Sequence, residues 1–579
     1  MKFNGIAILG KRTSSGALGT TSRPRHWSPP IQCCMSTTIS ASVGFGANTR
    51  RFVLEFAFGL VALFAGMTWW TPIATAANSF TDSVIVTESG PVKGVVTPQI
   101  NEYLGIPYAA APEEALRWMP PQPFGRWHEI FEATQFANEC PQTDTSGSFA
   151  GDENCLFLNV YTPKVRRNHD KNGKLAVMVW IHGGGLTSGA GSEFDPTPLV
   201  AGGDVIVVTI NYRLGVLGFF AQPALDGEGH LAGNYGFMDQ QFALRWVKRN
   251  IKAFGGDPDR VTIFGESAGG LSVYSQIASP LAAGLFQRAI AQSGAYAGFA
   301  PDYRPEILPI AVAATTGNSF VESGAAFANH VGCTSQTAEC LRGVSARTLI
   351  GAQRTIFPSI DGAVLTQTPG MAFASGNFNR VPVMTGSNHD EYRFFVARDF
   401  FPLSDADYMG ALNAVFGPSL EPSVIADYPL GISPPVNEAE LQLAAAGTDG
   451  IFACTARRAM MVLSQYVATY AYEFNDENAP SPFLHLNFPL GAFHGADVQY
   501  LFNRNGVPAD FTADQQQLSQ TIITYWTQFA KTGNPNSPGQ PLWARYDHAT
   551  DLLQSLVPPV PAVESGFATD HNCAFWDLF

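Results

Sequence analysis

The hydrophobic pattern of the chain alternates between short apolar runs and longer helical spacings. Residues 175–181 and 205–210 are continuous apolar runs bounded by polar residues, which is typical of strands buried on both faces. Apolar positions recur with helical spacing between residues 240 and 254, and residues 261–264 then begin another strand. This order of strand, helix and strand predicts a parallel sheet covered by helices.

Later segments continue the same alternation. Strands are predicted at 381–385 and 469–474, and a helix at 521–531 ends before Gly533 and Pro535. Residues 404–449 have the least regular pattern, and we expect them to form a helical insertion on the substrate side. The fold class predicted is therefore α/β, with a large, mostly parallel central sheet flanked by helices.

The N-terminal region has the pattern of an export signal. Residues 1–34 lack periodicity, so we expect translation to begin at Met35. Two arginines at 50–51, an apolar run at 56–70 and the small residues 74–76 then predict cleavage after Ala76. The paired arginines favour the twin-arginine route; ordinary secretory export and an uncleaved anchor are the alternatives.

This interpretation divides the chain into two parts. Residues 1–76 form a dispensable extension with the signal, and residues 77–579 form a single domain without internal repeats. We expect the mature protein to be secreted or periplasmic, without a stable membrane anchor.

Composition narrows the possible partners. The chain has 34 Lys and Arg against 48 Asp and Glu, a net charge of −14, which disfavours nucleic acid and anionic membranes as ligands. With 46% hydrophobic and 14% charged residues, it has the composition of a globular protein.

The cysteines fit an oxidising destination. Six follow residue 77, namely Cys140, Cys155, Cys333, Cys340, Cys454 and Cys573. An oxidising compartment would pair this even number, although spacing alone leaves the connectivity open. The cysteine spacings make no zinc pattern with histidine, so no metal site is expected.

Two glycine-rich motifs point to acyl-transfer chemistry. Gly265-Glu266-Ser267-Ala268-Gly269 follows the strand at 261–264 and precedes an apolar segment at 271–277, which is the strand, turn and helix context of a nucleophile elbow. His182-Gly183-Gly184-Gly185 directly follows the strand at 175–181. Its glycines can direct backbone N–H groups toward a developing oxyanion.

A serine nucleophile also needs a base and an acid. In a hydrolase with this elbow both follow the serine in the chain, the acid first, which leaves six candidate bases: His330, His389, His485, His494, His548 and His571. His494 is favoured because apolar residues and glycines flank it, as on a loop beside a reacting centre. Asp390 and Glu391 both follow a predicted strand, and their positions do not decide between them.

These motifs lie in a longer pattern that resembles a known family. Phe254-Gly255-Gly256 followed by residues 261–269 resembles the active-serine signature of the type-B carboxylesterase and lipase family, which includes the cholinesterases. Further matches extend over nearly the whole chain after residue 77, at residues 105–109, 116–118, 153–160, 211–215, 239–240, 292–294 and 525–535. The signature at 153–160 departs from the family at Asn154, where aspartate is usual. We expect a bacterial secreted member.

The resemblance implies roles for individual residues. It implies an α/β-hydrolase fold in which Ser267 is the nucleophile, Glu391 rather than Asp390 is the acid, and His494 is the base. The N–H groups of Gly184, Gly185 and Ala268 would form the oxyanion hole, with Ser293 and Asp497 near the triad. It also implies disulfides Cys140–Cys155 and Cys333–Cys340, so that Cys454–Cys573 is the pair that remains.

The reaction implied is two-step acyl transfer without a metal or organic cofactor. The loop 141–154 is short and lacks the tryptophan with which cholinesterases bind a quaternary ammonium. We therefore expect a small-molecule ester of short or moderate length as substrate. The alternatives are a lipase acting on longer acylglycerols and a non-catalytic binding protein on the same fold. The sequence does not indicate an oligomeric state.

Overall fold

The computed structural model describes residues 84–164, 173–230, 233–296, 317–353, 358–431, 436–481 and 487–579. All of them belong to one compact unit, residues 79–579. The expected start at Met35, the export signal and its cleavage site lie outside the described residues, as does His485.

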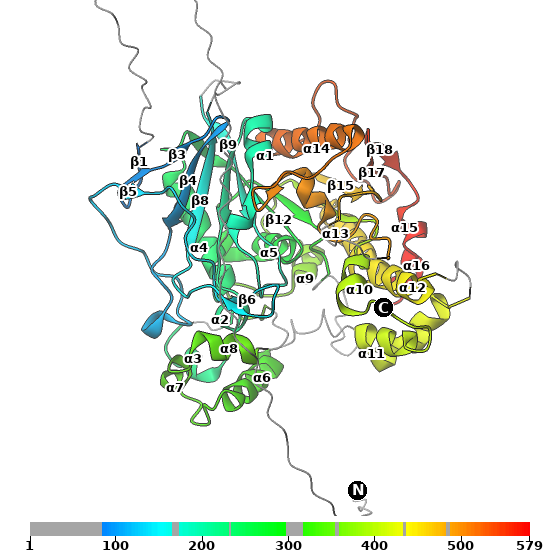
Figure 1. Cartoon of the computed structure of the whole chain (residues 1–579), viewed down its shortest axis with the longest axis horizontal. Coiled ribbons are helices and arrows are strands. Elements are labelled where there is room, and N and C mark those ends of the chain that lie inside the picture. Colours follow the sequence, from blue (N-terminus) through cyan, green and yellow to red (C-terminus); the bar gives the residue numbers. More distant parts are fainter. Residues whose placement is uncertain are drawn as a thin grey trace, which may run out of the picture. The chain divides into compact units, whose positions relative to one another are not determined.

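A large twisted sheet forms the centre of this unit (Figure 1). Its strands are β3 (Val95–Val96), β4 (Ile100–Pro107), β8 (Phe157–Pro163), β9 (Leu175–Ile181), β11 (Ile206–Ile210), β12 (Gly256–Glu266), β13 (Arg288–Gln292), β14 (Val383–Asn388), β15 (Thr469–Phe474), β17 (Leu553–Leu556) and β18 (Ala562–Glu564). Their spatial order in the described residues is β18-β17-β15-β14-β13-β12-β9-β11-β8-β4-β3. Neighbours from β11 to β17 pair in parallel, and those nearer the two edges pair antiparallel. The predicted α/β class with a mostly parallel sheet is confirmed.

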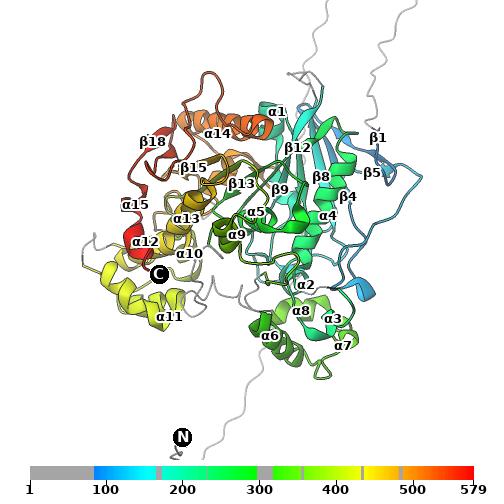
Figure 2. The same ribbon diagram turned by 180° about the vertical axis from the view of Figure 1, so that it is seen from behind.

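Helices cover both faces of the sheet, which explains the continuous apolar run of β9. Every residue of β9 is buried. Leu175, Val177, Val179 and Ile181 belong to the core that includes α4 (Tyr235–Asn250) and α5 (Ala268–Ala278). The intervening Ala176, Met178 and Trp180 belong to the core that includes α1 (Thr197–Gly203) and α14 (Ala513–Thr532). Figures 1 and 2 show α1 and α14 side by side.

Two predicted helices exist but have different ends. The helix expected at 240–254 is α4, which begins before the predicted start. The prediction began too late because the buried polar residues Asp239, Gln240 and Gln241 interrupt the apolar spacing. The helix expected at 521–531 is α14, which begins at Ala513 because Thr512 and Gln515 form a capping box. A side-chain cap thus marks the start of α14, whereas Asn234 before α4 makes no side-chain cap hydrogen bond.

The region 404–449 is helical, as expected. It contains α11 (Tyr408–Asp427), which is interrupted at Gly417, and α12 (Glu438–Gly447), followed by the π-helical turn η4 (Thr448–Ala453). The other described helices are α2 (Gly215–Gly218), α3 (Pro223–Asp226), α6 (Gly317–His330), α7 (Ala338–Arg342), α8 (Ala346–Ala352), α9 (Pro369–Ser375), α10 (Arg393–Asp399), α13 (Cys454–Leu463), α15 (Phe567–Asp570) and α16 (Cys573–Trp576). Within the described ranges, no helix has the length and apolarity needed to cross a membrane.

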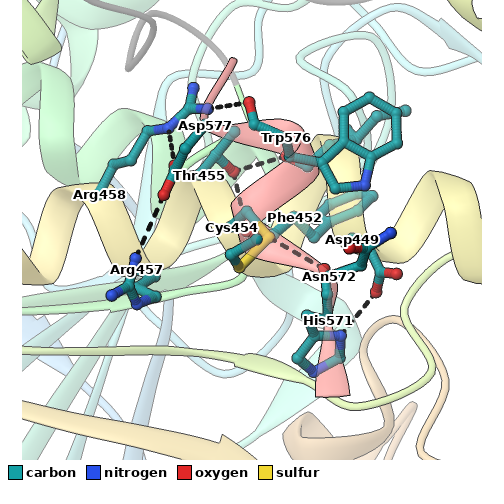
Figure 3. The surroundings of a disulfide bond; sticks show 12 residues. Asp449, Phe452, Cys454, Thr455, Arg457, Arg458, His571, Asn572, Trp576 and Asp577 are labelled. Carbon is teal, nitrogen blue, oxygen red and sulfur yellow. Dashed lines mark hydrogen bonds and ion pairs between the residues drawn. A yellow bond between two sulfur atoms is a disulfide. The ribbon is translucent and has the colours of Figure 1, made fainter. Parts of the chain in front are cut away.

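Three disulfide bonds join all six cysteines that follow residue 77. They are Cys140–Cys155, Cys333–Cys340 and Cys454–Cys573, with sequence separations of 15, 7 and 119 residues. These are the pairs that the resemblance implies, including the remaining one. The bond of longest separation links the start of α13 to the start of α16 (Figure 3).

Candidate active site

Ser267 lies in a strained turn between β12 and α5. Its backbone has φ +56° and ψ −123°, a left-handed conformation that non-glycine residues rarely adopt. A Cβ atom on Gly265 or Gly269 would lie 2.4 or 2.0 Å from the Ile181 carbonyl oxygen, so β9 passes too close for any side chain there. The turn thus presents Ser267 at the carboxyl end of a parallel strand, as a nucleophile elbow requires.

The glycine loop after β9 lies against this serine. A Cβ atom on Gly183 would be 3.2 Å from the Ser267 Cβ atom. Gly184 and Gly185 have φ of +93° and +64°, and a Cβ atom on Gly184 would lie 2.2 Å from the Ser188 carbonyl oxygen. Within the described part of the chain, the N–H groups of Gly184, Gly185 and Ala268 donate no hydrogen bond to protein, so they are available to an oxyanion.

The residues beside this loop hold it in position. The Tyr212 hydroxyl donates to the His182 carbonyl oxygen at 2.8 Å, and the two rings stack with centroids 4.4 Å apart. Burial lowers the pKa of His182 to about 4. His182 is therefore neutral and acts as a support for the loop.

His494 and Glu391 form a close side-chain pair. The His494 Nδ1 atom lies 2.5 Å from the Glu391 Oε2 atom, and the Asn388 N–H donates to the Oε1 atom at 2.8 Å. Asp390 instead accepts from the Ala492 N–H at 2.9 Å and pairs with Arg393 at 2.8 Å. Of the two adjacent carboxylates, the geometry therefore places only Glu391 on the imidazole.

The other candidate histidines in the described residues have different surroundings. His389 faces Asp390 at 3.2 Å, and His571 lies between two carboxylates. His548 is an exposed residue and His330 ends α6. None of these four contacts the elbow.

Glu266 is a residue of the site that sequence reasoning did not single out. Its Oε1 atom lies 3.2 Å from the His494 Nε2 atom, although neither atom has a hydrogen-bond partner among the described residues. Burial, reinforced by Asp497 and Glu391, raises the pKa of Glu266 to about 7, while the His494 charge opposes that rise. Its position inside the Gly-x-Ser-x-Gly motif was the available signal.

Electrostatics at His494 follow from these carboxylates. Burial alone lowers the pKa of His494, but the charges of Glu266 and Glu391 outweigh burial and raise it to about 9. The site therefore stabilises an imidazolium, which is the charged species that a base becomes after taking a serine proton.

Asp497 connects the nucleophile side of the site to the acid side. It accepts from the Gln292 side chain at 2.6 Å and lies 3.5 Å from the Asn388 amide nitrogen. The Gln292 carbonyl oxygen in turn accepts from the Ser267 N–H at 2.9 Å. Burial raises the pKa of Asp497 to about 6. Residues 292–294 match the family pattern, but that match gave Gln292 no role, and no local pattern marks Asn388.

Ser293 occupies a buried position directly after Gln292. Its backbone has φ +50°, and its N–H donates to the Gly386 carbonyl oxygen at 2.9 Å. Its hydroxyl has no hydrogen-bond partner in the described ranges. The structure thus places Ser293 beside the residue that holds the elbow.

Aromatic rings enclose His494 on its remaining sides. The rings of Phe395 and Phe452 each lie 5.0 Å from the imidazole centroid, and Phe394 lies at 6.2 Å. Tyr296 packs against Phe452, with the ring centroids 5.6 Å apart. Phe394 and Phe395 come from α10 and Phe452 from η4, so sequence spacing did not group all of these residues.

The comparisons with known proteins agree with this geometry. Residues 81–576 match the Carboxylesterase family. The chain is 34% identical to the acylcarnitine hydrolase of Mus musculus, covering 79% of this chain and 84% of that protein. It is also 34% identical to the para-nitrobenzyl esterase of Bacillus subtilis, covering 81% and 94%, and to the cocaine esterase of Homo sapiens, covering 87% and 91%.

Solved structures give the same result. A thermophilic PNB esterase superposes with a TM-score of 0.71 at 31% identity, covering 86% of this chain and all of that one. A second PNB esterase structure has a TM-score of 0.70 at the same identity and coverage of this chain. The chain therefore belongs to the carboxylesterase family, and it is a carboxylic ester hydrolase with the α/β-hydrolase fold.

Proposed function

We propose that the protein hydrolyses esters through an acyl-enzyme on Ser267. His494 takes the serine proton as the oxygen attacks the ester carbonyl, and Glu391 holds the imidazole and stabilises its charge. The alcohol leaves with a proton from His494. Water then attacks the acyl-enzyme by the same route, which releases the acid and restores Ser267.

Backbone N–H groups carry the negative charge of each tetrahedral intermediate. Gly184, Gly185 and Ala268 would donate to this oxyanion because their N–H groups lack protein acceptors among the described residues. Loss of one such donor typically costs about 2.7 to 4 kcal/mol of transition-state stabilisation. We expect this to be the largest single contribution to the rate.

One observation carries the proposal. The His494 Nδ1 atom bonds to buried Glu391 at 2.5 Å, which leaves the Nε2 atom facing the elbow residue Glu266 at 3.2 Å. A buried carboxylate that orients an imidazole next to a nucleophile elbow is what the serine-hydrolase mechanism requires. The nearby carboxyl Asp390 makes other contacts and has no part in the reaction.

We propose esters of short or moderate length as substrates. The segment between Cys140 and Cys155 forms only a small hairpin of β6 (Gln142–Thr143) and β7 (Phe149–Ala150). A segment this short offers little material for the long lid that lipases close over water-insoluble substrates. The names of two relatives, an acylcarnitine hydrolase and a para-nitrobenzyl esterase, support small-molecule esters as substrates.

The experiment is hydrolysis of a series of p-nitrophenyl esters from acetate to palmitate. We expect rapid turnover of the short esters, and Ser267→Ala to reduce kcat by at least about 10³-fold because residual catalysis would come from the oxyanion site alone. Stoichiometric labelling by an organophosphate should occur on Ser267 and be absent from the variant. Activity that survives in Ser267→Ala would contradict the nucleophile assignment, and preference for emulsified long esters would favour the lipase alternative.

We also propose that the protein is exported from the cytosol. The support is chemical: the structure pairs every cysteine after residue 77, and structural disulfides persist in oxidising compartments.

A further inference from the structure

The C-terminal segment 571–577 contacts the turn η4 and the start of α13 through hydrogen bonds, ion pairs and a disulfide (Figure 3). We call this segment the C-terminal clamp. Its residue His571 is buried between two carboxylates: its Nδ1 atom lies 2.7 Å from Asp449 on η4, and its Nε2 atom lies 2.5 Å from Glu473 on β15. These two carboxylates raise the pKa of His571 to about 10 against the opposing effect of burial, so it is a cation that attracts both elements.

Two further attachments hold the clamp on the same turn. The Cys454–Cys573 disulfide joins it covalently to the residue that follows η4. Trp576 covers Gly450, where a Cβ atom would lie 2.6 Å from the indole ring. The indole N–H donates to the Tyr428 hydroxyl, which donates to Asp449, each at 2.7 Å. The turn η4 is therefore held at three points: the Asp449 carboxylate, the backbone at Gly450 and the disulfide at Cys454, which directly follows it.

The opposite side of η4 forms a wall of the active site. Phe452 packs against the His494 ring at 5.0 Å and against Tyr296 at 5.6 Å. The Thr448 hydroxyl accepts from the N–H of Tyr392, the residue after Glu391, at 3.0 Å. His571 itself lies 5.4 Å from the ring of His389, two residues before Glu391. A displacement of η4 would thus reach both the base and the acid.

We propose that the C-terminal clamp is a positioning element for the base, which holds η4 so that Phe452 packs against the His494 ring. The proposal rests on the proposed role of His494. Phe452 restricts rotation of the imidazole and excludes water from its face, and both effects favour proton transfer from Ser267. The clamp residues act through η4 and do not contact the reacting atoms.

The direct test is the pair Phe452→Ala and Phe452→Leu, assayed with p-nitrophenyl acetate and by the rate of organophosphate labelling. We expect the alanine variant to lower kcat and the labelling rate by roughly tenfold with little change in KM, because misplacement of a catalytic group affects the chemical step. The leucine variant, which keeps an apolar side chain of similar reach, should recover most of the loss. Phe373→Ala, which removes a buried ring from α9, is the matched control and should keep the native kcat.

The clamp itself is tested by His571→Gln and by the double change Cys454→Ser with Cys573→Ser. Both changes should lower kcat, as Phe452→Ala does, at temperatures where circular dichroism shows that the variants are folded. The control is Cys333→Ser with Cys340→Ser. It removes the disulfide that joins Cys333 to α7 and should lower only thermal stability. If the clamp variants lose stability but keep the native kcat, or if Phe452→Ala raises KM alone, the proposal is wrong.

These outcomes are separable from failure of the proposed function. Native enzyme that is not labelled by the organophosphate, or turnover that survives Ser267→Ala, would overturn the role of Ser267 and His494. Native labelling that depends on Ser267, combined with clamp variants of unchanged kcat, would overturn the clamp alone.

Discussion

Glu266 sets the charge that His494 experiences. It immediately precedes Ser267 in the chain, yet its carboxylate lies 3.2 Å from the imidazole. A base must be neutral to accept a proton, so kcat/KM should fall as the pH decreases through the pKa of His494. Because that pKa is raised to about 9, we expect an alkaline optimum.

The substitution Glu266→Gln should move this acid limb to lower pH. Removal of the carboxylate takes away the largest of the attractions that raise the pKa of His494, so a neutral imidazole persists to lower pH. The measurement is the pH profile of kcat/KM for both proteins between about pH 5 and 10, because Glu266 and His494 both titrate within this range. An acid limb at the same pH in the variant would show that Glu266 carries no charge in the free enzyme.

Residues differ in how far the sequence alone could assign them. Ser267 and the loop after His182 were recognisable because each function is encoded in consecutive residues around a forced turn. The positions of Asp390 and Glu391 alone did not decide between them, whereas the family resemblance implied Glu391, and the structure places that carboxylate on His494. Assignments from local position alone therefore stop where the partner is distant in the chain.

At the scale of elements, buried ion pairs join the motifs that carry the family resemblance. Arg213, after β11, pairs with Asp239 on α4 through two hydrogen bonds of 2.7 Å, and both side chains are buried. Arg213 follows Tyr212, whose hydroxyl supports the oxyanion loop. The pair thus anchors α4 to the strand end that holds this loop.

We expect Asp239→Asn to lower the free energy of unfolding by about 3–5 kcal/mol, because it leaves the Arg213 charge buried without a counter-charge. Replacing both residues, as Arg213→Met with Asp239→Leu, should recover much of this loss since no buried charge remains. Urea unfolding of the native, single-variant and double-variant proteins measures the difference. A double variant less stable than the single one would mean that the pair contributes net stability.

The elements that the sequence predicted best are those buried on both faces. The strand expected at 175–181 has the same ends in the structure, because its apolar run reflects burial of every residue. Helix ends were less predictable, since Asp239 and the Thr512 capping box involve polar contacts that apolar spacing does not record.

At the scale of the whole molecule, covalent links tie distant parts of the chain together. The Cys454–Cys573 bond spans 119 residues, against 7 for Cys333–Cys340. In the chain-entropy model, constraint of the unfolded chain grows with loop length, to roughly 4.9 kcal/mol for the longer span and about 2.4 kcal/mol for the shorter one. The oxidised state is therefore part of the folded protein's stability.

We expect the protein isolated from its native compartment to begin at Ala77 and to contain no free thiol. N-terminal sequencing and thiol titration in denaturant, before and after reduction, measure both properties. The physical basis is that an exported chain loses its signal and meets an oxidant that pairs its cysteines. Cytosolic protein that keeps residues 35–76 and has reactive thiols would contradict export.

The sequence by itself determined the α/β fold class, the nucleophile turn and the oxyanion loop. Each is a local property: burial of consecutive residues, or a backbone path that only glycine permits, leaves its record within a few neighbouring positions. Only the tertiary structure brought Glu266 onto the imidazole and set η4 between the C-terminal clamp and the active site, and it placed on His494 the carboxylate that the family resemblance implies. Those relations join residues far apart in the chain, 122 positions in the case of His571 and Asp449, and they depend on how the packed elements meet.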